Sequence, residues 1–147
     1  MLVASFMAAF DLFVVNIAVP VLRSDLRVGD GALELIVSGY AFTYAAGLVT
    51  GGRLGDRFGY RRMFILGMAS FTVASLLCAL AVTPVQLVAA RLLQGLAASL
   101  MVPQVLSVIT VTFPAGHRGR ATAWMGAVTG LGALAGQILG GLLLQVD

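Results

Sequence analysis

Two charged residues lie within apolar stretches of this 147-residue sequence. Asp11 lies ten residues into the first stretch, and a helical rise of about 1.5 Å per residue places it near the middle of a bilayer. A central Asp costs about 2.5 to 3.5 kcal/mol to insert, so it normally faces water, pairs with a cation or takes up a proton. Burial favours the protonated carboxyl and a nearby cation favours the carboxylate, so Asp11 is a candidate proton carrier. A purely structural counter-ion is the alternative.

Arg91 is the second such residue, six positions after Val85, where another apolar stretch begins. If that helix enters from the side opposite to the first, Arg91 lies about 9 Å deep, comparable with Asp11. The two charges can pair if both helices line one cavity, and protonation of Asp11 would then free Arg91 for another partner. Alternatively, the long side chain of Arg91 snorkels to the nearer interface.

Two amides accompany these charges. Gln94 follows Arg91 by three positions and shares its helix face, and Asn16 shares a face with Pro20, four positions on. Both are candidates for contact with a substrate or cavity, and hydrogen bonding between helices explains them equally well. The sequence shows no nucleophile with a base, phosphate-cradling loop or cluster of metal ligands, so we expect neither an enzyme nor a metal nor a cofactor.

The segment 52–62 holds four of the nine arginines, one acid and three glycines between two long apolar runs. Glycine permits tight reversals that side chains would obstruct. We therefore expect a short polar loop that joins two membrane spans. Its candidate functional residues are Gly52, Asp56, Arg57, Gly59, Arg61 and Arg62.

The composition predicts an all-α membrane protein, because 60% of the residues are hydrophobic and only 10% are charged. Helices satisfy their own backbone amides in lipid and need about 20 residues to cross it. A signal peptide fits the first stretch poorly, because it lacks a basic start and Asp11 interrupts it. We expect five spans, at residues 1–21, 33–52, 63–82, 85–113 and 121–146, with a kink at Pro103 in the fourth.

The fifth expected span has a face rich in glycine. Gly132, Gly136 and Gly140 are four residues apart, and Gly141 falls on the same half of the helix. Small residues at this spacing allow two membrane helices to approach closely. We expect helix packing along this face, at either a static or a moving interface.

The arginines also predict the orientation in the membrane. Segments 53–62 and 114–120 carry six of them, whereas the opposite side has Arg23 and Arg27 mixed with acids. The positive-inside rule places the arginine-rich segments, and with them the amino terminus, in the cytoplasm. Because these arginines lie in short links rather than on one basic face, they indicate topology and not nucleic-acid binding.

Together these motifs resemble a known family. The chain looks like the amino-terminal part of a major facilitator superfamily transporter, most like the fourteen-span drug:proton antiporter branch. Residues 52–61 resemble the signature between spans two and three, residues 10–20 the branch's first-span signature, and residues 91–95 the fourth-span motif. In the fifth span, Gln137 stands where the antiporter motif Gly-Pro-x-x-Gly-Gly has its proline.

The resemblance implies proton-coupled transport by alternating access, in which two six-helix halves rock about a site at the midplane. It implies multidrug or antibiotic efflux across the cell membrane, of a small amphipathic or cationic substrate, with the proton gradient in place of a cofactor. Asp11 would bind the proton, Arg91 would modulate it, and the loop at 52–62 would gate the cytoplasmic side against the other half. The chain would be a fragment, with most of one half and no carboxy-terminal half. The alternatives are an uptake symporter of the same fold and a non-transporting membrane scaffold or truncated product.

Overall fold

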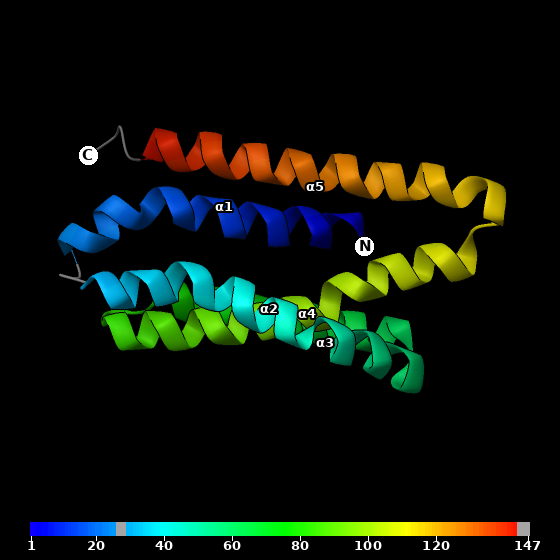
Figure 1. Ribbon diagram of the computed structural model, residues 1–147, viewed down its shortest axis with the longest axis horizontal. Helices are drawn as coiled ribbons and strands as arrows, with labels where there is room; N and C mark the ends of the chain where they lie inside the picture. Colours follow the sequence, from blue (N-terminus) through cyan, green and yellow to red (C-terminus); the bar gives the residue numbers. More distant parts are fainter. Residues whose placement is uncertain (26–28, 144–147) are drawn as a thin grey trace.

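The computed structural model describes residues 1–25 and 29–143, and nearly all of them are helical (Figure 1). No strand occurs in these ranges. The bounds of the five helices are α1 Leu2–Asp25, α2 Asp30–Phe58, α3 Tyr60–Ala79, α4 Pro84–Thr112 and α5 Ala115–Leu143.

Four helical segments are long and apolar enough to cross a membrane: Gly31–Phe58, Tyr60–Ala79, Pro84–Thr112 and Ala115–Leu142. The first helix is also apolar over Leu2–Ile17. The expected fold class, an all-α membrane protein with five helices, is therefore confirmed. The carboxy-terminal end of the fifth expected span and Arg27 lie outside the described residues.

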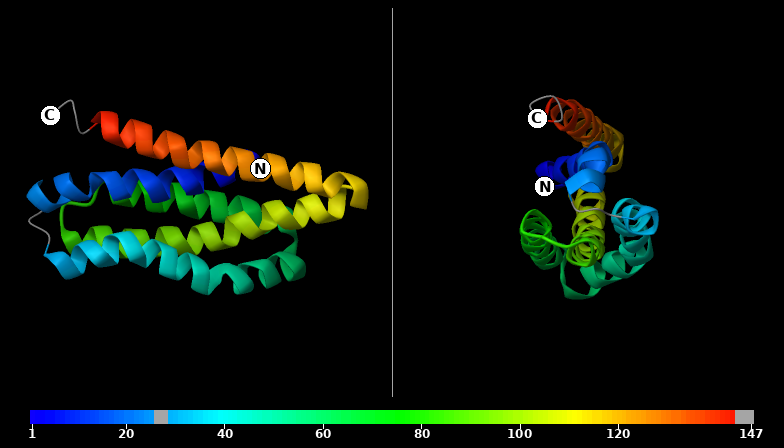
Figure 2. Two further views of the ribbon diagram at one scale, coloured as in Figure 1. Left: turned by 45° about the horizontal axis from the view of Figure 1, so that its top comes forward. Right: turned by 90° about the vertical axis from the view of Figure 1, so that its left-hand side faces the viewer.

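The helices run alternately in opposite directions and form two groups (Figures 1 and 2). In one group α4 packs against both α2 and α3, and in the other α1 packs along α5. Figure 2 shows the second group lying beside the first when the molecule is viewed along its length. The two groups meet where α1 contacts α2 and α4, and where α5 contacts α4.

The expected loop at 52–62 is wrong in extent, because α2 continues to Phe58 and α3 begins at Tyr60. Gly59 alone separates them, with a φ of 94° that L side chains rarely adopt. Gly52 and Gly55 are helical and do not turn the chain. A helix can continue beyond the apolar run because its backbone bonds are internal, so charged residues end the hydropathy signal before they end the helix.

The expected polar loop at 114–120 is likewise shorter than predicted. Only Phe113 and Pro114 lie between α4 and α5, and residues 115–120 form the first turns of α5. The guanidinium of Arg118 donates from Nε to the carbonyl oxygen of Phe113 at 2.9 Å, which satisfies a group at the end of α4.

The fourth helix begins and bends where proline predicts. The hydroxyl oxygen of Thr83 accepts a hydrogen bond from the Gln86 amide, and Pro84 occupies the first turn. Pro103 lies inside α4, and the helix changes direction along its length in Figure 1. Because proline removes an internal hydrogen bond, it allows such a bend.

Candidate proton-coupling site

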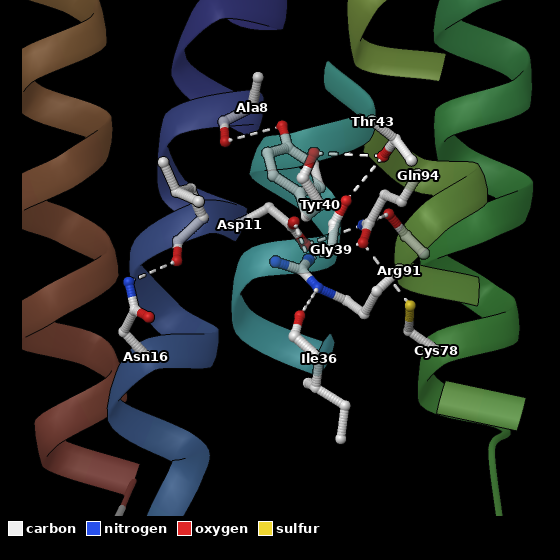
Figure 3. Close-up of polar contacts among 12 residues, drawn as sticks. Ala8, Asp11, Asn16, Ile36, Gly39, Tyr40, Thr43, Cys78, Arg91 and Gln94 are labelled. Carbon is white, nitrogen blue, oxygen red and sulfur yellow. Dashed lines mark hydrogen bonds and ion pairs between the residues drawn. The ribbon is translucent and has the colours of Figure 1, made fainter. Parts of the chain in front are cut away.

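Asp11 and Arg91, 80 positions apart in the sequence, are paired between α1 and α4 (Figure 3). Nη1 of Arg91 donates to Oδ2 of Asp11 at 2.5 Å. The arginine side chain is 1% exposed and the aspartate side chain 19% exposed. The structure therefore brings together the two charges that the sequence placed at comparable depth, and Arg91 does not snorkel to an interface.

Gln94 closes this pair into a three-residue network. Its Nε2 donates to Oδ1 of Asp11 at 2.8 Å, and its Oε1 accepts from Nη1 of Arg91 at 2.7 Å. Nε2 also donates to Oγ of Ser75 on α3 at 2.8 Å, and the Cys78 thiol donates to Oε1 at 3.6 Å. Both carboxylate oxygens of Asp11 are thus held, and α3 supports the network through two small polar side chains.

The second helix supplies the other side of Arg91. Nε of Arg91 donates to the carbonyl oxygen of Ile36 at 3.3 Å, and the guanidinium carbon lies 4.6 Å from the centre of the Tyr40 ring. This is a cation–π contact away from water, where such contacts are strongest. The Tyr40 hydroxyl lies 3.4 Å from the carbonyl oxygen of Ala8 on α1, to which it donates. Arg91 and Tyr40 therefore connect α1, α2 and α4.

This arrangement would change with the charge on Asp11. A buried ion pair offsets the loss of hydration only while both charges are present. Protonation of Asp11 would leave the guanidinium of Arg91 uncompensated, and its Nη2, already buried without a hydrogen-bond partner, could bind elsewhere. Among the described residues, no group of His, Cys, Asp and Glu side chains is placed to hold a metal ion.

Asn16 does not join this network. Its Nδ2 donates to the carbonyl oxygen of Leu12 on the same helix at 3.1 Å, and the side chain is exposed. Figure 3 shows it on the side of α1 that faces away from Arg91 and Gln94. Of the two amides singled out in the sequence, only Gln94 lies beside the ion pair.

The charged residues around Gly59 are remote from the ion pair and largely exposed. The Tyr60 hydroxyl donates to Oδ1 of Asp56 at 2.8 Å, and the guanidinium of Arg57 lies over the Phe58 ring, 5.5 Å from its centre. A β-carbon on Gly52, in the turn of α2 before them, would meet nothing within 4 Å. Arg61 and Arg62 are exposed in the first turn of α3.

Three of the four candidate packing glycines lie against α1. A β-carbon on Gly132 would collide with the backbone of Phe6, and one on Gly136 would lie 2.6 Å from the carbonyl oxygen of Phe10. At Gly140 it would meet the Ile17 side chain at 3.2 Å, whereas at Gly141 it would meet nothing within 4 Å. The close approach of α5 thus involves Gly132, Gly136 and Gly140, and not Gly141.

Sequence reasoning missed four members of the network. Tyr40 was noticeable only because it shares a helix face with Tyr44, and Ser75 and Cys78 had no signal beyond their polarity in an apolar run. Ile36 contributes only its backbone carbonyl, which no side-chain pattern can reveal.

A family model described as Major Facilitator Superfamily matches residues 1–146. The chain belongs to this superfamily. The family expected from the motifs is therefore confirmed, and the protein is a multi-pass membrane protein of a transporter family.

Its relatives are named as transporters, as export proteins or as resistance proteins. An uncharacterized MFS-type transporter of Mycobacterium tuberculosis is 42% identical over 99% of this chain. The probable actinorhodin transporter of Streptomyces coelicolor is 42% identical over 98% of it, and the tetracenomycin C resistance and export protein of Streptomyces glaucescens is 40% identical over 95% of it. The chain spans 25%, 25% and 26% of the lengths of these three relatives.

Proposed function

We propose that this chain supplies the first helices of a proton-coupled exporter of antibiotics or other drug-like molecules. The observation that carries the proposal is the buried Asp11–Arg91 pair, closed by Gln94, within apolar helices. The name of the tetracenomycin C resistance and export protein supports export as the direction. Because the chain spans a quarter of their length, we propose that further helices complete the transport cavity.

In the proposed cycle, the carboxylate of Asp11 first holds Arg91 and Gln94 in place. A proton from the outside then binds the carboxylate, and the ion pair is lost. Arg91 loses its charged partner but keeps its contacts with Ile36 and Tyr40 on α2, so the change acts on the contacts of α1 with α2 and α4. Release of the proton to the cytoplasm restores the pair, and the proton gradient is the energy source.

The proposed setting is the cell membrane, with the amino terminus and the α2–α3 link on the cytoplasmic side. Asp56, Arg57, Arg61 and Arg62 are exposed there. They could bind the other half of the transporter in one state and release it in the other, which is the gating role expected for this segment.

The test is drug-driven proton exchange in proteoliposomes that contain a transporter with this chain as its first segment. Asp11→Asn is expected to abolish the exchange while drug binding persists, because the amide cannot take up the proton. Glu34→Gln is the matched control, since Glu34 is an exposed acid on α2, and it should exchange normally. Unchanged exchange in Asp11→Asn would remove Asp11 from the mechanism.

The same vesicles separate the two alternatives. An uptake symporter would carry substrate inward together with the proton and dissipate the opposite substrate gradient. A membrane scaffold would show no exchange, and Arg91→Ala would impair its assembly rather than turnover.

A further inference from the structure

A partly open cavity is lined by residues of α1, α2, α4 and α5, among them Tyr40, which also contacts Arg91 of the ion pair. Its volume is about 420 Å³, within the range of small-molecule sites, about 300 to 1,000 Å³. Its aromatic and hydroxyl-bearing lining residues are Phe13, Tyr40, Tyr44, Ser5 and Thr129, and its other lining residues are apolar or glycine. In the described part of the chain, no charged side chain lines it.

Two tyrosines form the aromatic part of this lining. The rings of Tyr40 and Tyr44 are stacked, with centres 6.3 Å apart and planes inclined by 12°. Tyr40 is buried beside Arg91, whereas Tyr44 is only partly buried and lines the open space. A flat aromatic ligand could therefore extend the stack at Tyr44, and ring pairs prefer such offset stacking.

The polar groups of the cavity are hydroxyls. Ser5 is only 3% exposed, and its Oγ has no hydrogen-bond partner within the protein. The Thr129 hydroxyl donates to the carbonyl oxygen of Met125 at 2.8 Å, which leaves its lone pairs free to accept. Hydroxyls can bind carbonyl and hydroxyl groups of a neutral ligand. A cationic ligand would lose its hydration here without a counter-charge, because the carboxylate of Asp11 is held by Arg91 and Gln94.

We propose that this cavity binds uncharged, planar aromatic molecules that carry carbonyl or hydroxyl groups, with Tyr44 as the stacking surface and Ser5 as a hydrogen-bonding group. The inference rests on the proposed export function and narrows its substrate class, away from the cationic substrates that the family resemblance also allowed. Tyr40 lines the cavity and also contacts Arg91, so it is a positioning residue between the substrate and the proton site.

The test measures binding to a full-length transporter with this chain as its first segment, in nanodiscs, with two tricyclic fluorescent probes of similar size. Quinizarin is an uncharged hydroxyanthraquinone, and proflavine is a cationic acridine. Quinizarin is expected to bind more tightly than proflavine. Tyr44→Leu should weaken quinizarin binding about tenfold, the upper range for one aromatic stacking contact, and Tyr44→Phe should retain it.

Two further variants make this test specific. Phe42→Leu removes an aromatic ring that is 72% exposed on the same helix, so quinizarin binding should be unchanged. Ser5→Ala should weaken quinizarin binding several-fold without lowering the stability of the chain, because the hydroxyl has no partner within the protein.

Tighter binding of proflavine, or equal losses in Tyr44→Leu and Phe42→Leu, would overturn the inference. These outcomes are independent of proton coupling. If quinizarin binds no more tightly than proflavine while drug-driven proton exchange depends on Asp11, only the proposed substrate class is contradicted. Selective quinizarin binding with unchanged exchange in Asp11→Asn would contradict the proposed function alone.

Discussion

Arg91 is the residue through which the proposed site acts. It is 1% exposed, and its guanidinium contacts a carboxylate, an amide oxygen, a backbone carbonyl and an aromatic ring. Each contact compensates part of the hydration that a buried cation loses. Of these four partners, only Asp11 can gain or lose charge by proton uptake. The compensation of the buried guanidinium charge would therefore change only at its contact with Asp11, which is what a proton-driven switch requires.

We predict that Arg91→Met destabilises the chain by about 3 to 5 kcal/mol, because it leaves the carboxylate of Asp11 buried without its cation. Asp11→Asn combined with Arg91→Met should recover much of this loss, since no uncompensated charge remains. Unfolding by SDS, followed by circular dichroism, measures both variants. Arg62→Met, at an exposed arginine, is the control and should change little. Additive effects of the two substitutions would show that the charges are not coupled.

For single residues, the sequence predicts well how deep a side chain lies in the membrane, and poorly which neighbouring helix it faces. Counting residues put Asp11 and Arg91 at one level, and the three-residue spacing put Gln94 beside Arg91 regardless of how α4 is rotated. Asn16 is five residues from Asp11, about 140° around the helix at 3.6 residues per turn. It therefore points elsewhere, and only the packing of α1 decides which of the two side chains faces α4. Tyr40 and Ser75 were missed for the same reason.

At the scale of elements, hydropathy predicts where lipid ends and not where a helix ends. The second span was expected to end at Gly52, but α2 continues for six more residues to Phe58. Of the three glycines in the signature, only Gly59 turns the chain. Gly55 instead lies against the Gln104 side chain of α4, where a β-carbon would collide with the amide. The glycine pattern is visible in the sequence. The sequence does not show that Gly59 turns the chain whereas Gly55 packs against α4.

The pairing of α1 with α5 gives a matched prediction on two glycines. Gly132→Ala would push the new methyl group into the backbone of Phe6, so we expect it to separate the helices and to cost about 1 to 3 kcal/mol. Gly126→Ala, on the same helix in open space, should be neutral or stabilising by up to about 1 kcal/mol through helix propensity. SDS unfolding measures stability, and spin-label distances between α1 and α5 measure the separation. Equal effects of the two variants would contradict close packing at Gly132.

For the whole molecule, the proposed site lies at the seam between the two helix groups. Asp11 belongs to the α1–α5 pair, whereas Arg91, Gln94 and Tyr40 belong to the group of α2, α3 and α4. The ion pair, the bond from Gln94 to Asp11 and the bond from Tyr40 to Ala8 all cross this seam. In the proposed cycle, a proton on Asp11 would therefore weaken contacts between the groups. Residues from both helix groups line the cavity that contains Tyr44, so the proposed proton site and the proposed substrate site share one interface.

The orientation of the whole molecule gives the last prediction. The α2–α3 and α4–α5 links lie at one end and the α3–α4 link at the other (Figure 1), so one cysteine at each end reports the topology. In a Cys78→Ala background, His117→Cys should react with a membrane-impermeant maleimide in inside-out vesicles, and Val82→Cys in right-side-out vesicles. Both positions are exposed, so access depends on the side of the membrane rather than on burial. The reverse pattern would place the arginine-rich end outside. The Gly59 end would then face outward, and the cytoplasmic gating role proposed for Asp56, Arg57, Arg61 and Arg62 would be wrong.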